Sequence, residues 1–158
     1  MDLCTATLAE CFLPDGHQRR YSGPLPAESE GLLQMVSGLE YLHSRSVIHG
    51  NLKPQNVLLS TGQSVTFKLS DAGQRDGTLS IWMAPEILKA VQCESQRQVH
   101  ADDVGKPASD VWSLGCLFFY FLQKGSHPFQ DVNMLRTLGN IVEGNAVQLK
   151  FLSGKLTH

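Results

Sequence analysis

The sequence predicts a mainly α-helical fold with one small β-hairpin, and three patterns lead to this expectation. Apolar residues recur every three or four positions between residues 28 and 43, which is typical of a helix that buries one face. A short apolar run over 57–59 and an alternation of apolar and polar residues over 65–70 are typical of two paired strands. The apolar stretch from Val111 to Leu122 is too short to cross a bilayer, so it indicates a helix at the centre of the core.

The first helix is predicted to follow a surface loop over residues 14–29. Pro26 and the acidic residues Glu28 and Glu30 are typical of the first turn of a helix. The pattern continues to about His43. The apolar positions expected on the buried face are Leu32, Met35, Val36, Leu39 and Leu42.

A hairpin is predicted next, from the strand-like segments 57–59 and 65–69 with Gly62 in the connection between them. The segment from Lys89 to Pro107 is polar and has no helical periodicity, so a long loop is expected there.

Two helices are predicted in the second half of the chain. Ser109 and Asp110 are expected to cap the apolar helix, and Gly125 suits its C-terminal end. Asp131 is expected to cap a last helix that closes near Gly144. The apolar residues of that helix are Val132, Leu135, Leu138 and Val142.

Composition narrows the class of protein. The chain has 158 residues, 42% of them hydrophobic, which suffices for one globular unit with a core. A formal net charge of -2 gives no basic field of the kind that nucleic acids or anionic membranes attract, so neither partner is expected. The first residues lack the pattern of a signal peptide, which favours a cytoplasmic, reduced chain. The cysteines, which form no Cys-x-x-Cys pair and are expected to be buried or incidental, are Cys4, Cys11, Cys93 and Cys116.

The residues that could take part in catalysis or ligand binding lie in four segments. The loop between the first helix and the hairpin reads Ile48-His49-Gly50-Asn51-Leu52-Lys53-Pro54-Gln55-Asn56, and Asp71-Ala72-Gly73 follows the second strand. Further along stand Ala84-Pro85-Glu86 and Ser109-Asp110-Val111-Trp112-Ser113-Leu114-Gly115.

Each of these residues also has an ordinary structural explanation. Taken alone, Asp71 fits a turn at the end of a strand, and Asn56 fits a capping amide. Lys53 fits a solvated surface charge, and His49 fits a structural histidine. The order and spacing of the four segments together favour a single functional site.

The four segments resemble the H-R-D-L-K-x-x-N, D-F-G, A-P-E and D-x-W-S-x-G motifs of eukaryotic protein kinases. The resemblance implies a protein-kinase-like fold, of which this chain carries only the large C-terminal lobe, with the small lobe absent. Residues 1–158 are then one partial kinase domain, from the hinge to about helix G, and no transmembrane segment or nuclease domain is expected.

The same resemblance implies that the site takes ATP and Mg²⁺. Asn56 and Asp71 would hold the metal through hard oxygen ligands, and Lys53 would offset charge on the moving phosphate. A nucleotide contact is implied for Leu58. Lys53, Asn56 and Asp71 are therefore expected to lie together beneath a nucleotide-sized gap.

The departures from the kinase motifs matter as much as the matches. Asn51 occupies the catalytic position of the aspartate that accepts the substrate proton, and a carboxamide cannot take up that proton near neutral pH. Gly50 replaces an arginine, and Ala72 replaces a phenylalanine. The sequence thus predicts a degenerate catalytic loop.

Three stretches narrow the family. Leu3 to Leu8, Trp82 to Glu86, and Gly115 to Tyr120 with Gly125 to Phe129 resemble the inositol-requiring serine/threonine kinase/endoribonuclease of the endoplasmic reticulum, with ribonuclease L as a more distant relative. In that family the kinase domain is an allosteric dimerisation platform on the cytosolic face of the membrane, for a separate RNA-cleaving domain. No nuclease activity is expected from residues of this chain.

Three hypotheses follow. The first is a pseudokinase that acts as a nucleotide-responsive or allosteric platform and pairs as a homodimer in its full-length form. The second is a weakly active serine/threonine kinase that uses Mg-ATP in the full-length protein, and the third is a truncated fragment without independent function. The sequence leaves the substrate and the oligomeric state open.

Overall fold

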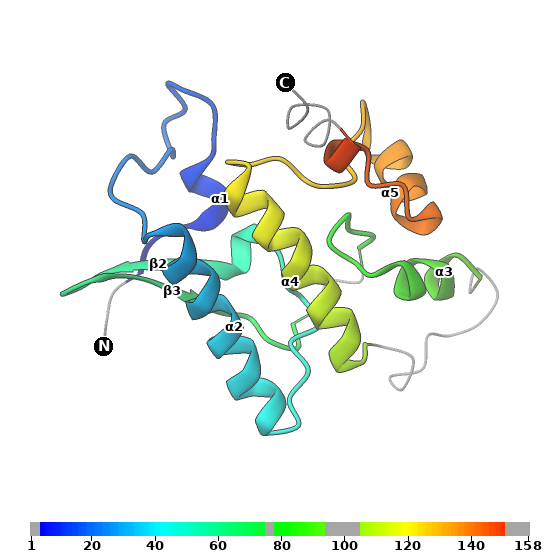
Figure 1. Cartoon of the computed structure of the whole chain (residues 1–158), viewed down its shortest axis with the longest axis horizontal. Coiled ribbons are helices and arrows are strands. Elements are labelled where there is room, and N and C mark those ends of the chain that lie inside the picture. The colour runs from blue at the N-terminus through cyan, green and yellow to red at the C-terminus, as the bar shows by residue number, and fades with distance from the viewer. Residues whose placement is uncertain (1–3, 75–77, 94–104, 151–158) are drawn as a thin grey trace.

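The computed structural model describes residues 4–74, 78–93 and 105–150, and Figure 1 shows their arrangement. Helices α2 and α4 lie side by side at the centre, with the sheet on one side of them and α3 and α5 on the other. The elements in chain order are β1 (Cys4–Thr7), α1 (Leu8–Cys11), α2 (Glu28–Ser44), the 3₁₀ turn η1 (Pro54–Asn56), β2 (Val57–Thr61), β3 (Val65–Leu69), α3 (Pro85–Cys93), α4 (Pro107–Leu122) and α5 (Met134–Glu143).

Helix α2 forms where it was predicted, but its buried face is turned slightly from the predicted one. Gly31, Met35 and Leu39 are the buried residues of the helix, at i, i+4, i+8 spacing, whereas Val36 is 39% exposed. The rotation follows from close packing at Gly31, because a Cβ there would lie 2.8 Å from the ring of Phe121. Gly31, which has no side chain, therefore lies where α2 packs closely against Phe121.

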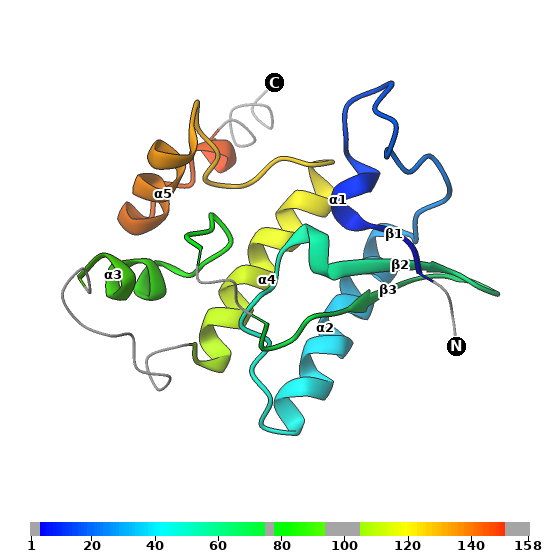
Figure 2. The same cartoon turned by 180° about the vertical axis from the view of Figure 1, so that it is seen from behind.

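The predicted hairpin is confirmed, but it belongs to a sheet of three antiparallel strands in the order β1-β2-β3. Val57 pairs with Leu69 across the hairpin, and Thr7 of β1 pairs with Leu58 on the other side of β2. Figure 2 shows the sheet from the side on which β1 is visible. Strand β1 was not predicted because it has only four residues, and its formation depends on pairing with residues more than 50 positions away.

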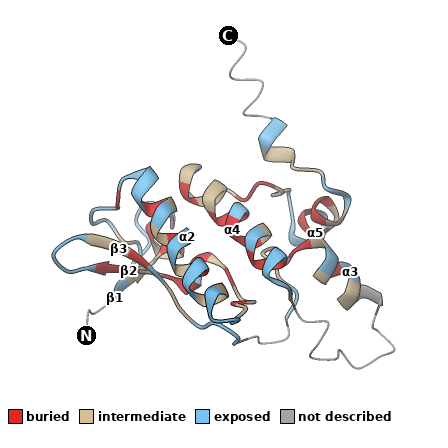
Figure 3. Cartoon of the chain, turned by 60° about the horizontal axis from the view of Figure 1, so that its bottom comes forward, coloured by how far each residue is buried: buried red, intermediate tan, exposed pale blue. Residues whose placement is uncertain are grey.

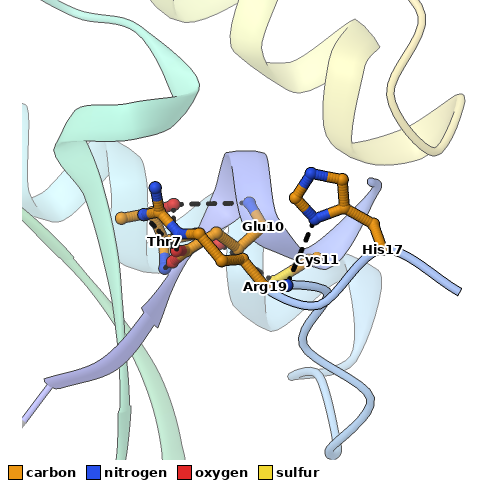
Figure 4. Close-up of polar contacts among 5 residues, drawn as sticks. All are labelled: Thr7, Glu10, Cys11, His17 and Arg19. Atoms are coloured by element: carbon orange, nitrogen blue, oxygen red, sulfur yellow. Dashed lines mark hydrogen bonds and ion pairs between the residues drawn. The ribbon is translucent and has the colours of Figure 1, made fainter. Parts of the chain in front are cut away.

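Helix α1 has only four residues and is held by polar contacts, which Figure 4 shows. The backbone N–H of Glu10 donates to Thr7 Oγ1 (3.3 Å), and the backbone N–H of Thr7 donates to Glu10 Oε2 (2.8 Å). This reciprocal pair is a capping box. Arg19 donates to Glu10 Oε1 from Nε (3.0 Å) and Nη2 (2.6 Å). The Thr7 backbone contact is the main reason why the pKa of Glu10 lies below its ordinary value.

The expectation of a loop from Lys89 to Pro107 is wrong at both ends. Lys89 and the residues up to Cys93 belong to α3, which buries Leu88 against α5. Pro107 is already the first residue of α4. Tertiary packing overrides the polar composition here, since α3 buries one side and leaves Lys89 exposed. Residues 94–104 lie outside the described part of the chain.

Helix α4 begins two residues earlier than predicted, so Ser109 and Asp110 are not its cap. Lys106 is the N-cap residue, and Pro107 opens the first turn, where its missing N–H costs nothing. The predicted central position of the helix is confirmed on its inner face, although Val111 is 59% exposed. The buried apolar residues of α4 are Leu114, Cys116, Leu117 and Phe121. Just after the helix, the Gly125 N–H donates to the Tyr120 carbonyl (2.9 Å).

Helix α5 is capped by Asn133 and not, as predicted, by Asp131. Asn133 Oδ1 accepts the backbone N–H of Arg136 at 3.0 Å. The predicted end at Gly144 is confirmed, with a left-handed φ of 71°. Val132 and Leu135, predicted on the apolar face, are 80% and 81% exposed, while Leu138 and Ile141 carry the buried face.

The buried apolar residues form two clusters, and Figure 3 shows buried positions along α4 and on the inner side of α2. The larger cluster joins α1, α2, α4 and the sheet, and the smaller one joins α3 and α5 through Leu88, Leu138 and Ile141. Cys11 and Cys116 are buried, as expected for incidental thiols, whereas Cys4 is exposed. Within the described residues, no helix combines the length and the apolar character needed to span a bilayer.

Candidate nucleotide site

The loop that carries the candidate residues is anchored to α4 by the carboxylate of Asp110. This side chain is 2% exposed and accepts the backbone N–H of His49 at Oδ2 (2.8 Å) and that of Gly50 at Oδ1 (2.7 Å). His43 Nε2, at the end of α2, lies 2.8 Å from the same Oδ2. One buried carboxylate thus joins the end of α2, the loop and the start of α4.

His49 and Gly50 shape the start of the loop. The His49 side chain is fully buried, and its Nδ1 accepts the backbone N–H of Asn51 (3.3 Å). Burial lowers the pKa of His49, and the Asp110 carboxylate opposes this fall. Gly50 has a φ of 67°, a conformation that glycine adopts without strain. The histidine therefore has the structural role that the sequence allowed for it.

The register of the hairpin places Asn56 and Asp71 at the same end of its two strands. Val57 pairs with Leu69, and the ladder continues because the Ser70 N–H donates to the Asn56 carbonyl (3.0 Å). Asp71 is the next residue along, with a left-handed φ of 56° that aspartate tolerates. Both side chains thus lie at the same end of the hairpin.

The donor set of these two residues fits a magnesium ion. Asn56 Nδ2 donates to the Asn51 carbonyl (2.8 Å), which leaves its Oδ1 as an acceptor. Asp71 Oδ2 accepts from the Ser70 hydroxyl (2.9 Å), while the exposed carboxylate keeps a second oxygen. Hard oxygen ligands of this kind are what Mg²⁺ prefers.

The backbone of Lys53 is joined to that of Asn56, because the Asn56 N–H donates to the Lys53 carbonyl (2.9 Å). Together with Gln55, Lys53 lines an open cleft of about 630 Å³ whose other walls come from residues 79–82, from α4 and α5, and from the segment between these two helices. Neither Asn56 nor Asp71 is among the lining residues of that cleft. Asn56 and Asp71 thus lie at the same end of the hairpin, whereas Lys53 lines a neighbouring cleft.

Leu58 sits on the middle strand of the sheet. Val57 and Leu59, on either side of it, are fully buried in the larger core cluster, whereas Leu58 is half-buried. Because successive strand residues point to opposite faces, Leu58 faces away from that cluster. This orientation leaves it available for contact with a ligand on the other face of the sheet.

Asn51 is half-buried, and its side chain acts as a hydrogen-bond donor. Its Nδ2 donates to the backbone carbonyl of Gln74, 23 residues further along the chain. A carbonyl oxygen can only accept, so the NH₂ group and not the oxygen of Asn51 faces it. The position of the kinase base is therefore engaged in a contact that an ionised aspartate could not make.

The sequence does not predict the roles that Asp110 and His127 have in this region. Asp110 is predicted as a helix cap, although its place in the D-x-W-S-x-G motif is the signal for a larger role. His127 lies in the Gly125 to Phe129 stretch, without a predicted role of its own. It is 2% exposed, lines the cleft beside Lys53, and contacts Trp82 edge to face with ring centroids 4.7 Å apart.

Comparison with known families defines the class of protein. Residues 26–153 match the protein kinase domain family, so the chain belongs to that family. The mainly helical, protein-kinase-like fold predicted from the motifs is thereby confirmed.

The most similar relatives include several kinase/endoribonucleases. The serine/threonine-protein kinase/endoribonuclease ireA of Aspergillus fumigatus is 31% identical over 185 aligned residues, covering 92% of this chain and 16% of that protein. IRE1 of Oryza sativa subsp. japonica is 41% identical over 61% of this chain and 11% of its own length, and IRE2 of Homo sapiens is 34% identical over 91% and 16%. The predicted resemblance to this group is confirmed, and the chain spans between 11% and 16% of the length of these relatives.

Proposed function

We propose that this chain is a pseudokinase-type domain of a kinase/endoribonuclease relative, which takes up ATP or another nucleotide with Mg²⁺ and acts as an allosteric platform. The proposal includes its assignment as one partial kinase domain over residues 1–158. It also includes pairing of two such domains in the longer protein, on the cytosolic side of the endoplasmic reticulum membrane. The observation that carries it is Asn51, which occupies the base position and donates a hydrogen bond there.

The retained residues support nucleotide uptake. Bound Mg-ATP supplies the transferable phosphate and much of the neutralising charge. Asn56 and Asp71 would hold the metal through their remaining oxygens, and Lys53, three residues before Asn56, would offset phosphate charge from the neighbouring cleft. Leu58 would contact the nucleotide from the face of the sheet that is turned away from the core.

Proton transfer is the step that this loop lacks. A neutral carboxamide does not accept a proton near pH 7, and the Asn51 NH₂ group is already directed at the Gln74 carbonyl. Losing a general base costs on the order of 10² to 10⁴ in rate. Binding without efficient transfer is the behaviour that this residue set supports.

A weakly active serine/threonine kinase is the alternative, and one observation favours it. Lys53 and Gln55 line the same cleft as residues 79–82, so the loop faces an open space of about 630 Å³. Lys53, Asn56 and Asp71 alone could then sustain slow phosphate transfer in the longer protein.

Calorimetric titration of the chain with ADP, with and without Mg²⁺, tests the proposal. We expect binding that requires Mg²⁺, and at least about tenfold weaker binding by Asp71→Asn, since a charged ligand becomes a neutral one. Glu40→Gln is the matched control, because it removes an exposed carboxylate from the outer side of α2. Binding that is independent of Mg²⁺, or equal in Asp71→Asn, would contradict the proposal.

Transfer of radiolabelled phosphate from ATP to a serine/threonine peptide separates the two functions. The pseudokinase proposal requires that the chain, and the longer protein that contains it, label the peptide no faster than the Asp71→Asn variant does. Labelling by the longer protein that Asp71→Asn abolishes would instead establish the weak kinase.

A further inference from the structure

The segment that follows β3 has little apolar packing to hold it. Asp71, Ala72, Gly73 and Gln74 are all exposed, so burial cannot fix their position. Polar contacts with the catalytic loop are what the structure offers instead. The Gly73 N–H donates to the His49 carbonyl (2.7 Å), and the Gln74 carbonyl accepts from the Asn51 side chain.

Asn51 connects this segment to the rest of the site. Its backbone carbonyl accepts the Asn56 amide (2.8 Å), and its backbone N–H is held by the buried His49 ring. The Asn51 main chain is thus held by hydrogen bonds on both sides, which directs its side chain at the Gln74 carbonyl. A donor on a fixed backbone loses little conformational entropy when it makes its hydrogen bond.

The chemistry of this contact separates asparagine from aspartate. A carboxylate at position 51 would have the same size and shape, but it would set two negatively charged oxygens against a carbonyl oxygen. The hydrogen bond would be lost and replaced by repulsion. Only a side chain with an N–H or O–H group satisfies the Gln74 carbonyl from this position.

We propose that Asn51 is a positioning residue that fastens the segment following Asp71 to the catalytic loop, and that restoring the kinase aspartate would release this segment. Asn51 then has a structural role, in addition to being a side chain that cannot act as a general base. This inference does not depend on nucleotide binding. Asn51→Asp should therefore displace residues 71–74 at the same time as it restores a carboxylate at position 51.

Amide hydrogen exchange followed by NMR in the chain without nucleotide tests the proposal. At pH 7 we expect the Gly73 and Gln74 amides to exchange about tenfold faster in Asn51→Asp and in Asn51→Ala, which corresponds to the loss of one hydrogen bond. Asn51→Gln keeps the NH₂ donor, so its exchange should stay closer to wild type than that of Asn51→Ala. Amides of α2 serve as the internal reference for global unfolding.

Asn145→Asp is the matched control. Asn145 Nδ2 donates to Asn140 Oδ1 (3.3 Å), so this variant introduces the same charge and removes a side-chain donor at another place. It should leave Gly73 and Gln74 unchanged. Wild-type exchange of these two amides in Asn51→Asp would overturn the proposal, as would equal acceleration in Asn51→Gln and Asn51→Ala.

Discussion

At the scale of single residues, the most consequential side chains are buried polar groups whose partners come from distant parts of the chain. Asp110 accepts two backbone N–H groups from a loop 60 residues earlier. His127 is enclosed between Trp82 and Phe129, and its Nδ1 accepts the Phe129 N–H (3.3 Å). Asp110 holds the loop of the candidate site, and His127 packs beside the cleft that Lys53 lines.

His127 should make the protein less stable in mild acid. Burial lowers the pKa of His127 from 6.5 to about 4, so the unfolded state binds more protons than the folded state between these values. Stability should therefore fall as the pH drops from about 6.5 to about 4, by on the order of 3 kcal/mol from this residue. Urea unfolding at several pH values measures the effect.

The control for this prediction is His127→Phe, which keeps an aromatic ring beside Trp82. His49 has a pKa that burial also lowers, so some pH dependence should remain in the variant. The difference between the two proteins belongs to His127. Parallel pH profiles for wild type and His127→Phe would show that protonation of this ring does not oppose folding.

At the scale of elements, close packing of α2 decides which side of the helix faces the core. A Cβ at Gly31 would meet the rings of Phe121 and Phe67 at 2.8 and 2.9 Å, and these two rings pack edge to face at 5.2 Å. At Gly38 the nearest atoms belong to the flexible end of Leu69, at 3.3 Å. A Cβ at Gly31 would thus meet two packed aromatic rings, whereas a Cβ at Gly38 would meet a flexible leucine side chain.

Gly31→Ala should destabilise the protein, and Gly38→Ala should not. Overpacking two buried rings costs about 1–3 kcal/mol, which exceeds or offsets the gain of up to about 1 kcal/mol from replacing glycine in a helix. At Gly38 the Leu69 side chain can move aside. The stabilisation from replacing glycine in a helix should therefore roughly cancel the cost of the close contact with Leu69. Thermal and denaturant unfolding of both variants measures the difference, and a Gly31→Ala protein as stable as wild type would count against rigid packing there.

The elements also show how far a local pattern predicts a fold. The α2 range and the hairpin strands were predicted correctly, because periodicity and turn residues are local signals. The cap of α4 was predicted at Ser109 and Asp110 and that of α5 at Asp131, yet Lys106 and Asn133 occupy those positions. Aspartate suits a cap and a buried acceptor equally well, so residue type alone does not distinguish the two roles.

At the scale of the whole molecule, the two core clusters differ in size and in what covers them. The larger one is enclosed by the sheet, α2 and α4, while the smaller one rests on Leu88, Leu138 and Ile141 of α3 and α5. Val132, just before α5, and Leu135, in its first turn, are 80% and 81% exposed. The smaller cluster therefore has less apolar burial to hold its helices in place.

Helices α3 and α5 should open before the rest of the protein. Native-state hydrogen exchange should give lower opening free energies for amides of α5 than for those of α2 and α4, because fewer buried contacts resist opening. Leu138→Ala should lower the free energy of opening of α3 and α5 by about 2–4 kcal/mol and leave α2 much less affected. Equal acceleration in all helices would show one cooperative unit instead.

The sequence by itself determined the kinase-like order of motifs, the helical and hairpin ranges, and the presence of Asn51 where the kinase motif has an aspartate, because all of these are readable within short windows of residues. Only the tertiary structure decided that β1 completes the sheet and that Asp110 anchors the catalytic loop. It also decided that Lys53 lines a cleft that Asn56 and Asp71 do not line, and that the Asn51 side chain donates to the Gln74 carbonyl. These outcomes depend on contacts between residues that lie 23 to more than 60 positions apart in the sequence. Many residues of the chain have the same donor and acceptor groups, so only the folded geometry determines which of them meet.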